Sequence, residues 1–187
     1  MTDSKLRNDA AVAAAWWREL TANDSHGRRT RGARRAALAR LRRAATPVEV
    51  ILEPEALRLL AALSGKGHAY RERAAILAGV LAAVREEDSQ PVMRALGRFA
   101  LDDAESARMS EARFRRLLQA EEDTQMDAMR RLVRLAGGKV DVYDLSDAIL
   151  HWGERIKRRW IFRYYNVEES LRLASGEPQS RTRTPAT

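Results

Sequence analysis

The sequence contains no cysteine, and its three histidines, His26, His68 and His151, lie far apart. A chain without cysteine forms neither disulfides nor thiolate metal sites, and it offers no cysteine nucleophile. The histidines show none of the short spacings that place two metal ligands on one helix face. Asp102 and Asp103 are adjacent carboxylates, but such a pair is more typical of a cap or a loop than of a cation site. We therefore expect no metal, no cofactor and no catalytic centre.

Long apolar runs are also absent. The longest run near the start of the chain covers residues 10–17, whereas a helix that spans a bilayer needs about 20 apolar residues. Asp3 and Asp9 precede this run, where a secretion signal would be basic. Together with the lack of cysteine, this predicts a soluble, cytoplasmic protein with no membrane partner.

Signals for β-strands are nearly missing, since Val48–Leu52 is the only β-like run. Apolar residues instead recur every three or four positions, as in Val12, Trp16 and Leu20, which is the spacing of a helix face. Asp9, or Asn8 before it, is the expected N-cap of that first helix. The sequence therefore predicts an all-α fold with about eight or nine helices.

A break in the apolar pattern falls at residues 86–91, EEDSQP, which are polar and end in proline. It predicts two small helical bundles packed together, at 8–88 and 91–174. Residues 175–187 have no apolar pattern and are expected to form a disordered tail. In the second half, Thr124 is the expected N-cap of a helix that ends at a pair of glycines.

The charge is strongly one-sided. The formal net charge is +8, and all but four of the 34 basic residues are arginine. Residues 27–43 contain eight arginines and no acidic residue, whereas a merely solvated helix face usually mixes both signs. On a helix, Arg28, Arg31, Arg35 and Arg42 fall in one stripe beside an apolar face. Because guanidinium groups bind phosphate oxygens with two hydrogen bonds, this stripe favours a polyanionic partner.

Two further basic clusters lie in the second half of the chain. The first contains Arg108, Arg113, Arg115, Arg116, Arg130, Arg131 and Arg134, and the second contains Arg155, Lys157, Arg158, Arg159 and Arg163. Aromatic residues are interleaved with the second cluster and could stack on bases. The spacing of Ile156, Trp160 and Tyr164 is more typical of a buried helix stripe, and we prefer that interpretation.

Two other functions are compatible with these patterns. Residues 126–136 and 141–150 form a helix pair joined by glycines, as in a helix-turn-helix DNA-binding regulator. Its second helix carries Asp144 and Asp147, however, which would be repelled by phosphates. The other alternative is a helical adaptor whose arginines bind acidic proteins.

The second half of the chain contains the strings RMSEARFRRLLQAEE and MDAMRRLVRLAGGKVDVYDLSDAILHWGERIKRRW, followed by a Tyr-Tyr pair. These segments resemble the CasB family, the small subunit of the type I-E CRISPR surveillance complex, Cascade. Near the N-terminus, Trp16-Trp17 and the string RRAALARLRR also fit the family. The resemblance covers roughly residues 10–166 and is strongest over 108–166.

The resemblance implies an all-helical protein without enzymatic activity of its own. It implies three partners: the other Cascade subunits with their guide RNA, a second copy of this chain, and target DNA, chiefly the displaced strand. Motif by motif it transfers a phosphate-binding role to Arg34, Arg35, Arg113, Arg130 and Arg131. Arg155 and Lys157 follow less directly, because Glu154 stands where the family often has a basic residue.

The basic clusters add Arg42 and Arg108 to these candidates. The full set of expected nucleic-acid-binding residues is therefore Arg34, Arg35, Arg42, Arg108, Arg113, Arg130, Arg131, Arg155 and Lys157. Arg34 also falls within the apolar arc of its helix, which is compatible with a buried ion pair instead.

Overall fold

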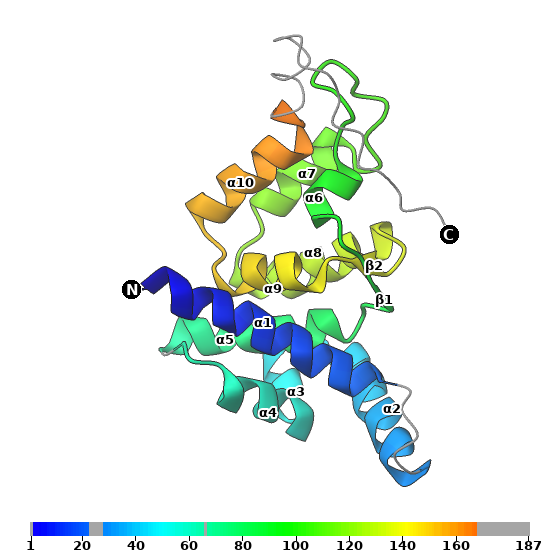
Figure 1. The fold of residues 1–187 in the computed structure, drawn as a ribbon, viewed down its shortest axis with the longest axis vertical. Helices are drawn as coiled ribbons and strands as arrows, with labels where there is room; N and C mark the ends of the chain where they lie inside the picture. Colours follow the sequence, from blue (N-terminus) through cyan, green and yellow to red (C-terminus); the bar gives the residue numbers. More distant parts are fainter. Residues whose placement is uncertain (1, 23–27, 66, 168–187) are drawn as a thin grey trace, which may run out of the picture.

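The computed structural model describes residues 2–22, 28–65 and 67–167. In these residues the chain forms ten helices and one pair of very short strands (Figure 1). The helices are α1 (Thr2–Thr21), α2 (Arg28–Arg43), α3 (Pro47–Ile51), α4 (Pro54–Ala62), α5 (His68–Leu81), α6 (Val92–Leu96), α7 (Glu111–Leu118), α8 (Glu122–Leu135), α9 (Val142–Leu150) and α10 (Glu154–Tyr164). The all-α prediction is confirmed, with slightly more helices than expected. The predicted tail lies outside the described residues.

The strands are β1 (Glu86–Glu87) and β2 (Lys139–Val140), which pair in parallel. Lys139 Nζ also lies 2.8 Å from Glu86 Oε1. The polar segment that was predicted to separate two bundles is therefore hydrogen-bonded to the loop between α8 and α9. Within the described residues, each helix is too short or too polar to span a bilayer.

The β-like run that begins at Val48 is helical up to Ile51, in agreement with the all-α prediction. Thr46 is the N-cap of α3, and its hydroxyl accepts a hydrogen bond from the amide of Glu49 at 3.2 Å. The Glu49 carboxylate in turn accepts one from the amide of Ala45 at 2.8 Å. This reciprocal capping, with Pro47 in the first turn, outweighs the β preference of the valines and isoleucine.

Two predicted N-caps are also wrong. Thr124 lies inside α8, whose N-cap is Glu121; the acidic residues at 121–123 stand at the helix N-terminus, where negative charge is stabilised. Asp9 lies inside α1 and is buried. Its carboxylate accepts hydrogen bonds from the Ser64 amide and hydroxyl, the Gly65 amide and the Tyr70 hydroxyl. Asp9 therefore fastens α1 to the turn between α4 and α5.

Helices from both halves of the sequence share the centre of the molecule. α9 packs against α1 and α5, and α8 also packs against α5. α6, α7 and α10 lie at one end, and α2 to α4 lie at the other (Figure 1). The buried hydrophobic side chains form one continuous core that extends from α1 to α10. The division into bundles at 8–88 and 91–174 stays a prediction.

Candidate nucleic-acid interface

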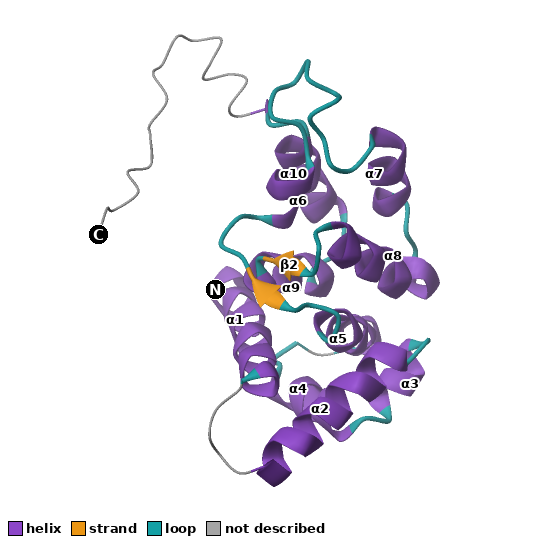
Figure 2. Cartoon of the chain, turned by 90° about the vertical axis from the view of Figure 1, so that its right-hand side faces the viewer, coloured by secondary structure: helices purple, strands orange, loops and turns teal. Residues whose placement is uncertain are grey.

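Four exposed arginines line a groove between α7 and α8. α7 begins after its N-cap Ser110 and buries Phe114 and Leu117. The opposite face of the helix is exposed to solvent. α8 buries Met129, Leu132 and Val133. In Figure 2, α7 lies above α8 on the same side of the molecule. The two helices thus hold their exposed side chains on either side of one depression.

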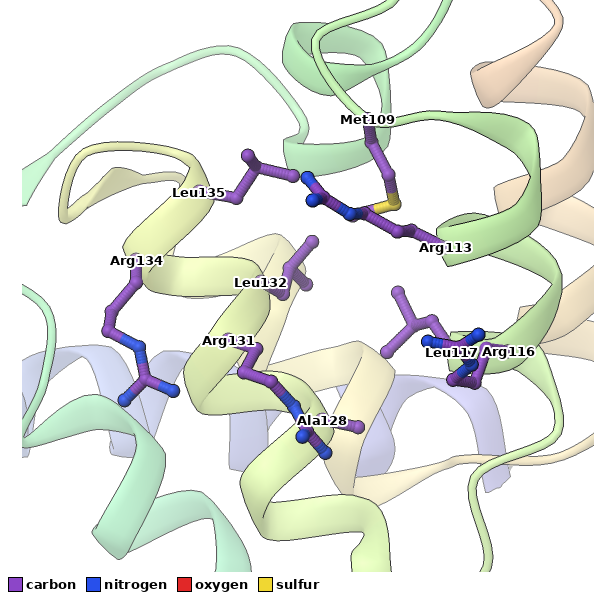
Figure 3. Close-up of a pocket in the computed structure, with 9 residues that line it drawn as sticks. All are labelled: Met109, Arg113, Arg116, Leu117, Ala128, Arg131, Leu132, Arg134 and Leu135. Atoms are coloured by element: carbon purple, nitrogen blue, oxygen red, sulfur yellow. The ribbon is translucent and has the colours of Figure 1, made fainter.

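The groove has a volume of about 460 Å³. Its lining consists of Met109, Arg113, Arg116, Leu117, Ala128, Arg131, Leu132, Arg134 and Leu135 (Figure 3). No acidic residue is among them. In Figure 3, the side chain of Arg113 reaches from α7 over the groove toward Leu135, whereas Arg134 points away from α7. The groove therefore has an apolar floor and cationic walls.

Among the residues that the structure describes, these arginines have no acidic partner, unlike several other exposed arginines. Arg40 pairs with Glu53, Arg58 with Glu55, and Arg115 with Glu111, each at 2.6–2.8 Å. Within the described residues, none of the four groove arginines takes part in an ion pair. Their charge is available to an anionic ligand, whose binding would not require breaking a salt bridge.

Three residues predicted from the sequence meet at this groove: Arg113, Arg131 and Arg108. Arg108 is exposed beside it, and its Nη2 donates to the carbonyl oxygen of Leu135 at 3.3 Å. Arg116 and Arg134 were recognised only as members of a basic cluster and not as binding residues. Each follows a predicted residue by three positions, which on a helix places both side chains on one face. That spacing is the signal that could have identified them.

Arg130 does not belong to this surface, so its predicted role in nucleic-acid binding is corrected. The side chain is buried, with 7% of the residue exposed. Its Nε, Nη1 and Nη2 donate to the carbonyl oxygens of Gly79, Ala44 and Leu41 at 3.1, 2.6 and 2.8 Å. Burial lowers the pKa of this guanidinium from its usual value. Arg130 fastens α8 to α2 and α5.

The predicted α2 residues lie at the opposite end of the molecule from α7 (Figures 1 and 2). The apolar face of α2 is buried through Ala37, Leu38 and Leu41, as the periodicity predicts. Arg35 is exposed and Arg34 is half-buried. Arg42 is exposed, but its Nε donates to the carbonyl oxygen of Ala82. These arginines therefore lie apart from the groove.

The predicted α10 residues are not brought to the groove either. Arg155 is exposed in the first turn of α10. Lys157 is half-buried, with Nζ 5.9 Å from the centre of the Trp152 ring. It lines a different pocket that also contains Glu121, Glu122 and Asp123, which would repel phosphate. Burial of Ile156, Trp160 and Tyr164 confirms that the aromatic stripe of α10 belongs to the core.

The helix-turn-helix alternative is incompatible with the position of α9. This helix is almost wholly buried and packs against α1 and α5, so it cannot enter a DNA groove. Its acidic side chains form ion pairs within the protein. Asp144 pairs with Arg163, and Asp147 pairs with Arg159 and His151. No group of three or more metal-ligating side chains occurs in the part of the chain that the structure describes.

Fold and site together define an all-helical protein whose exposed chemistry is that of arginines around an apolar groove. Residues 37–165 match the family of the CRISPR-associated protein Cse2. The chain belongs to the Cse2 family, which is the small, non-catalytic CasB subunit of Cascade. The predictions of a CasB-like protein and of a protein that is not an enzyme are thereby confirmed.

The fold also matches a solved structure. A chain in the crystal structure of E. coli Cascade bound to a PAM-containing double-stranded DNA target aligns with a TM-score of 0.58 and 21% sequence identity. The alignment covers 85% of this chain and 96% of that one, so nearly the whole of that fold is present here. No match was found among curated proteins.

Proposed function

We propose that this chain binds nucleic acid within a type I-E Cascade and stabilises the R-loop by holding the displaced DNA strand in the groove between α7 and α8. The observation that carries the proposal is the gathering of Arg113, Arg116, Arg131 and Arg134 around one groove without an acidic residue. Such a surface binds phosphates regardless of base sequence. A displaced strand of any sequence requires this kind of binding.

The free-energy balance of R-loop formation is close enough that a few phosphate contacts from the groove can decide it. The RNA–DNA heteroduplex is about as stable as the DNA duplex that it replaces, so contacts from protein to backbone decide the balance. A hydrogen bond to a charged group contributes about 1.5–3 kcal/mol. Two or three guanidinium–phosphate contacts are therefore enough to shift the equilibrium strongly toward the open state.

The partners that follow from this proposal are the other Cascade subunits with their guide RNA, target DNA, and a second copy of the chain. The solved complex in which a similar fold occurs is Cascade with double-stranded target DNA. The arginines of α2 lie apart from the groove, and we assign Arg35 and Arg42 to a second contact with nucleic-acid backbone. We also assign Arg34 and Arg155 to contacts with nucleic-acid backbone. Lys157 fits this role least, because its pocket contains acidic side chains.

The test is target-DNA affinity of a guide-loaded Cascade that lacks its small subunit and receives this protein back. The added chain is either unaltered or carries Arg113→Ala with Arg131→Ala. The matched control is Arg58→Ala with Arg115→Ala, which removes the same charge from exposed arginines that are paired with glutamates. We expect the groove variant to join the complex and to weaken target binding roughly 10- to 100-fold. The control should stay near the unaltered protein.

Two results would reject this proposal. If both double variants weaken binding equally, only net charge matters and the groove is not a site. If the groove variant binds target as well as the unaltered chain, the helical adaptor that contacts only proteins becomes the better interpretation.

A further inference from the structure

The groove between α7 and α8 has a feature that phosphate binding alone does not require. Its floor is apolar and consists of the side chains of Met109, Leu117 and Leu132, with Ala128 and Leu135 at its sides. The first three are nearly fully buried, and the last two are half-buried. Phosphates are strongly hydrated and gain nothing from contact with such a surface. The floor indicates a ligand that also has an apolar part.

The walls restrict the ligand further. Arg113 and Arg116 lie on one side of the groove and Arg131 lies on the other, while Arg134 also lines it but points away from α7 (Figure 3). No acidic side chain is among the lining residues. The ligand must therefore carry negative charge at its edges and apolar surface at its centre. A guanidinium plane can also stack on a flat aromatic ring, so the same arginines can contact both parts.

From this we infer that the groove takes an unstacked base of single-stranded DNA, with the flanking phosphates bound by its arginines. This inference rests on the proposed function and names the ligand of the same site. A nucleotide combines a flat ring with negative charge on both sides, and the volume of about 460 Å³ lies within the range of small-ligand pockets. In duplex DNA the bases are stacked inside the helix and only the backbone could reach the walls. The groove is thus selective for an unpaired strand.

The test compares two oligonucleotides with the same backbone. The full-length protein is titrated with a fluorescent 12-mer of oligothymidine and with a 12-mer in which abasic sites replace all bases. The unaltered protein should bind the base-bearing strand at least about fivefold more tightly, because a base in contact with protein adds to the affinity that phosphates provide. Arg113→Ala with Arg131→Ala should weaken binding of both strands.

A variant that fills the groove without altering charge separates the base from the backbone. Ala128→Leu places a larger side chain in the groove and should remove the preference for the base-bearing strand while retaining affinity for the abasic one. Ala112→Leu is the matched control, because it makes the same change at an exposed position of α7 outside the groove. It should keep the preference. Circular dichroism melting of both variants verifies that each is folded.

The outcomes distinguish this inference from the proposed function. Equal affinity of the unaltered protein for the two strands, or an unchanged preference in Ala128→Leu, overturns the base-binding inference and leaves the phosphate-binding proposal standing. Failure to bind either strand at low salt counts against both.

Discussion

Arg130 and Arg131 are neighbours with the same side chain, yet one is enclosed by backbone carbonyls and the other is exposed at the groove. Adjacent residues of a helix point about 100° apart, so a helix at an interface necessarily gives them different environments. The difference decides what each arginine contributes. Arg130 contributes to stability, and Arg131 is available for binding.

Arg130→Ala is expected to lower the free energy of unfolding by about 3 kcal/mol, because three buried carbonyl oxygens lose their donor. Arg131→Ala should change it by less than about 0.5 kcal/mol, as is usual for an exposed site. Urea denaturation followed by circular dichroism measures both. Equal stability of the two variants would contradict the structural role of Arg130.

Asp147 makes folding depend on pH. Burial alone would raise the pKa of its carboxyl group, but hydrogen bonds from His151 and Arg159 lower it to about 2. A carboxyl with a lowered pKa in the folded state stabilises the protein above its unfolded pKa of about 3.9, and this stability is lost as the pH falls toward 2.

Asp147→Asn should therefore lower the free energy of unfolding by about 2 kcal/mol at pH 7. The difference from the unaltered protein should shrink as the pH falls from about 4 toward 2, since the unfolded chain then binds a proton that the folded chain does not. Denaturation curves recorded over this range test the sign. Asp102→Asn, at an exposed loop position, makes the same substitution and serves as the control; it should change the free energy of unfolding at pH 7 by less than about 0.5 kcal/mol. A constant difference at all pH values would show that the effect is not ionic.

At the scale of elements, the packing of α6 against α10 depends on one glycine. A Cβ atom on Gly97 would lie 2.4 Å from the carbonyl oxygen and 2.6 Å from the Cα of Tyr164. The adjacent amide of Arg98 donates to that carbonyl oxygen at 2.7 Å. Because the neighbours are backbone atoms, they cannot move aside without displacing a helix. α6 and α10 hence approach at Gly97 more closely than any side chain would permit.

Gly97→Ala should destabilise the protein by about 1–3 kcal/mol through overpacking. Gly32 provides the opposite case, since it is exposed in α2 and a Cβ there would have no atom within 4 Å. Gly32→Ala should leave stability unchanged or raise it by up to about 1 kcal/mol, because alanine favours a helix. Thermal melting of the two variants measures the contrast. Similar melting temperatures would show that the approach of α6 to α10 is not critical.

At the scale of the whole molecule, the formal net charge is +8, which favours binding of a polyanion. If the four groove arginines each neutralise a phosphate, the logarithm of the affinity for single-stranded DNA should fall with the logarithm of salt concentration with a slope of about −3. Arg113→Ala with Arg131→Ala should reduce the slope to about −1.5. Titrations at salt concentrations between about 50 and 200 mM supply the measurement. A slope unchanged in this variant would mean that phosphates are bound elsewhere.

Much of the molecule followed from the sequence alone. Helical periodicity depends only on the order of apolar and polar residues, so the all-α class, the buried stripe of α10 and the apolar face of α2 were predictable. The basic clusters were predictable too, because charge is a property of composition. The family resemblance followed from strings that are contiguous in the chain.

Only the tertiary structure decided which of these charges are free and which of them meet. The burial of Arg130 depends on carbonyl groups of α2 and α5, at least 51 positions away in the sequence. The roles of Asp9 and Asp144 likewise depend on partners from distant segments. The groove exists because α7 and α8 pack side by side while their arginines remain outside the core. Periodicity assigns a residue to a helix face, but only packing determines whether that face meets another helix, a carbonyl oxygen or solvent.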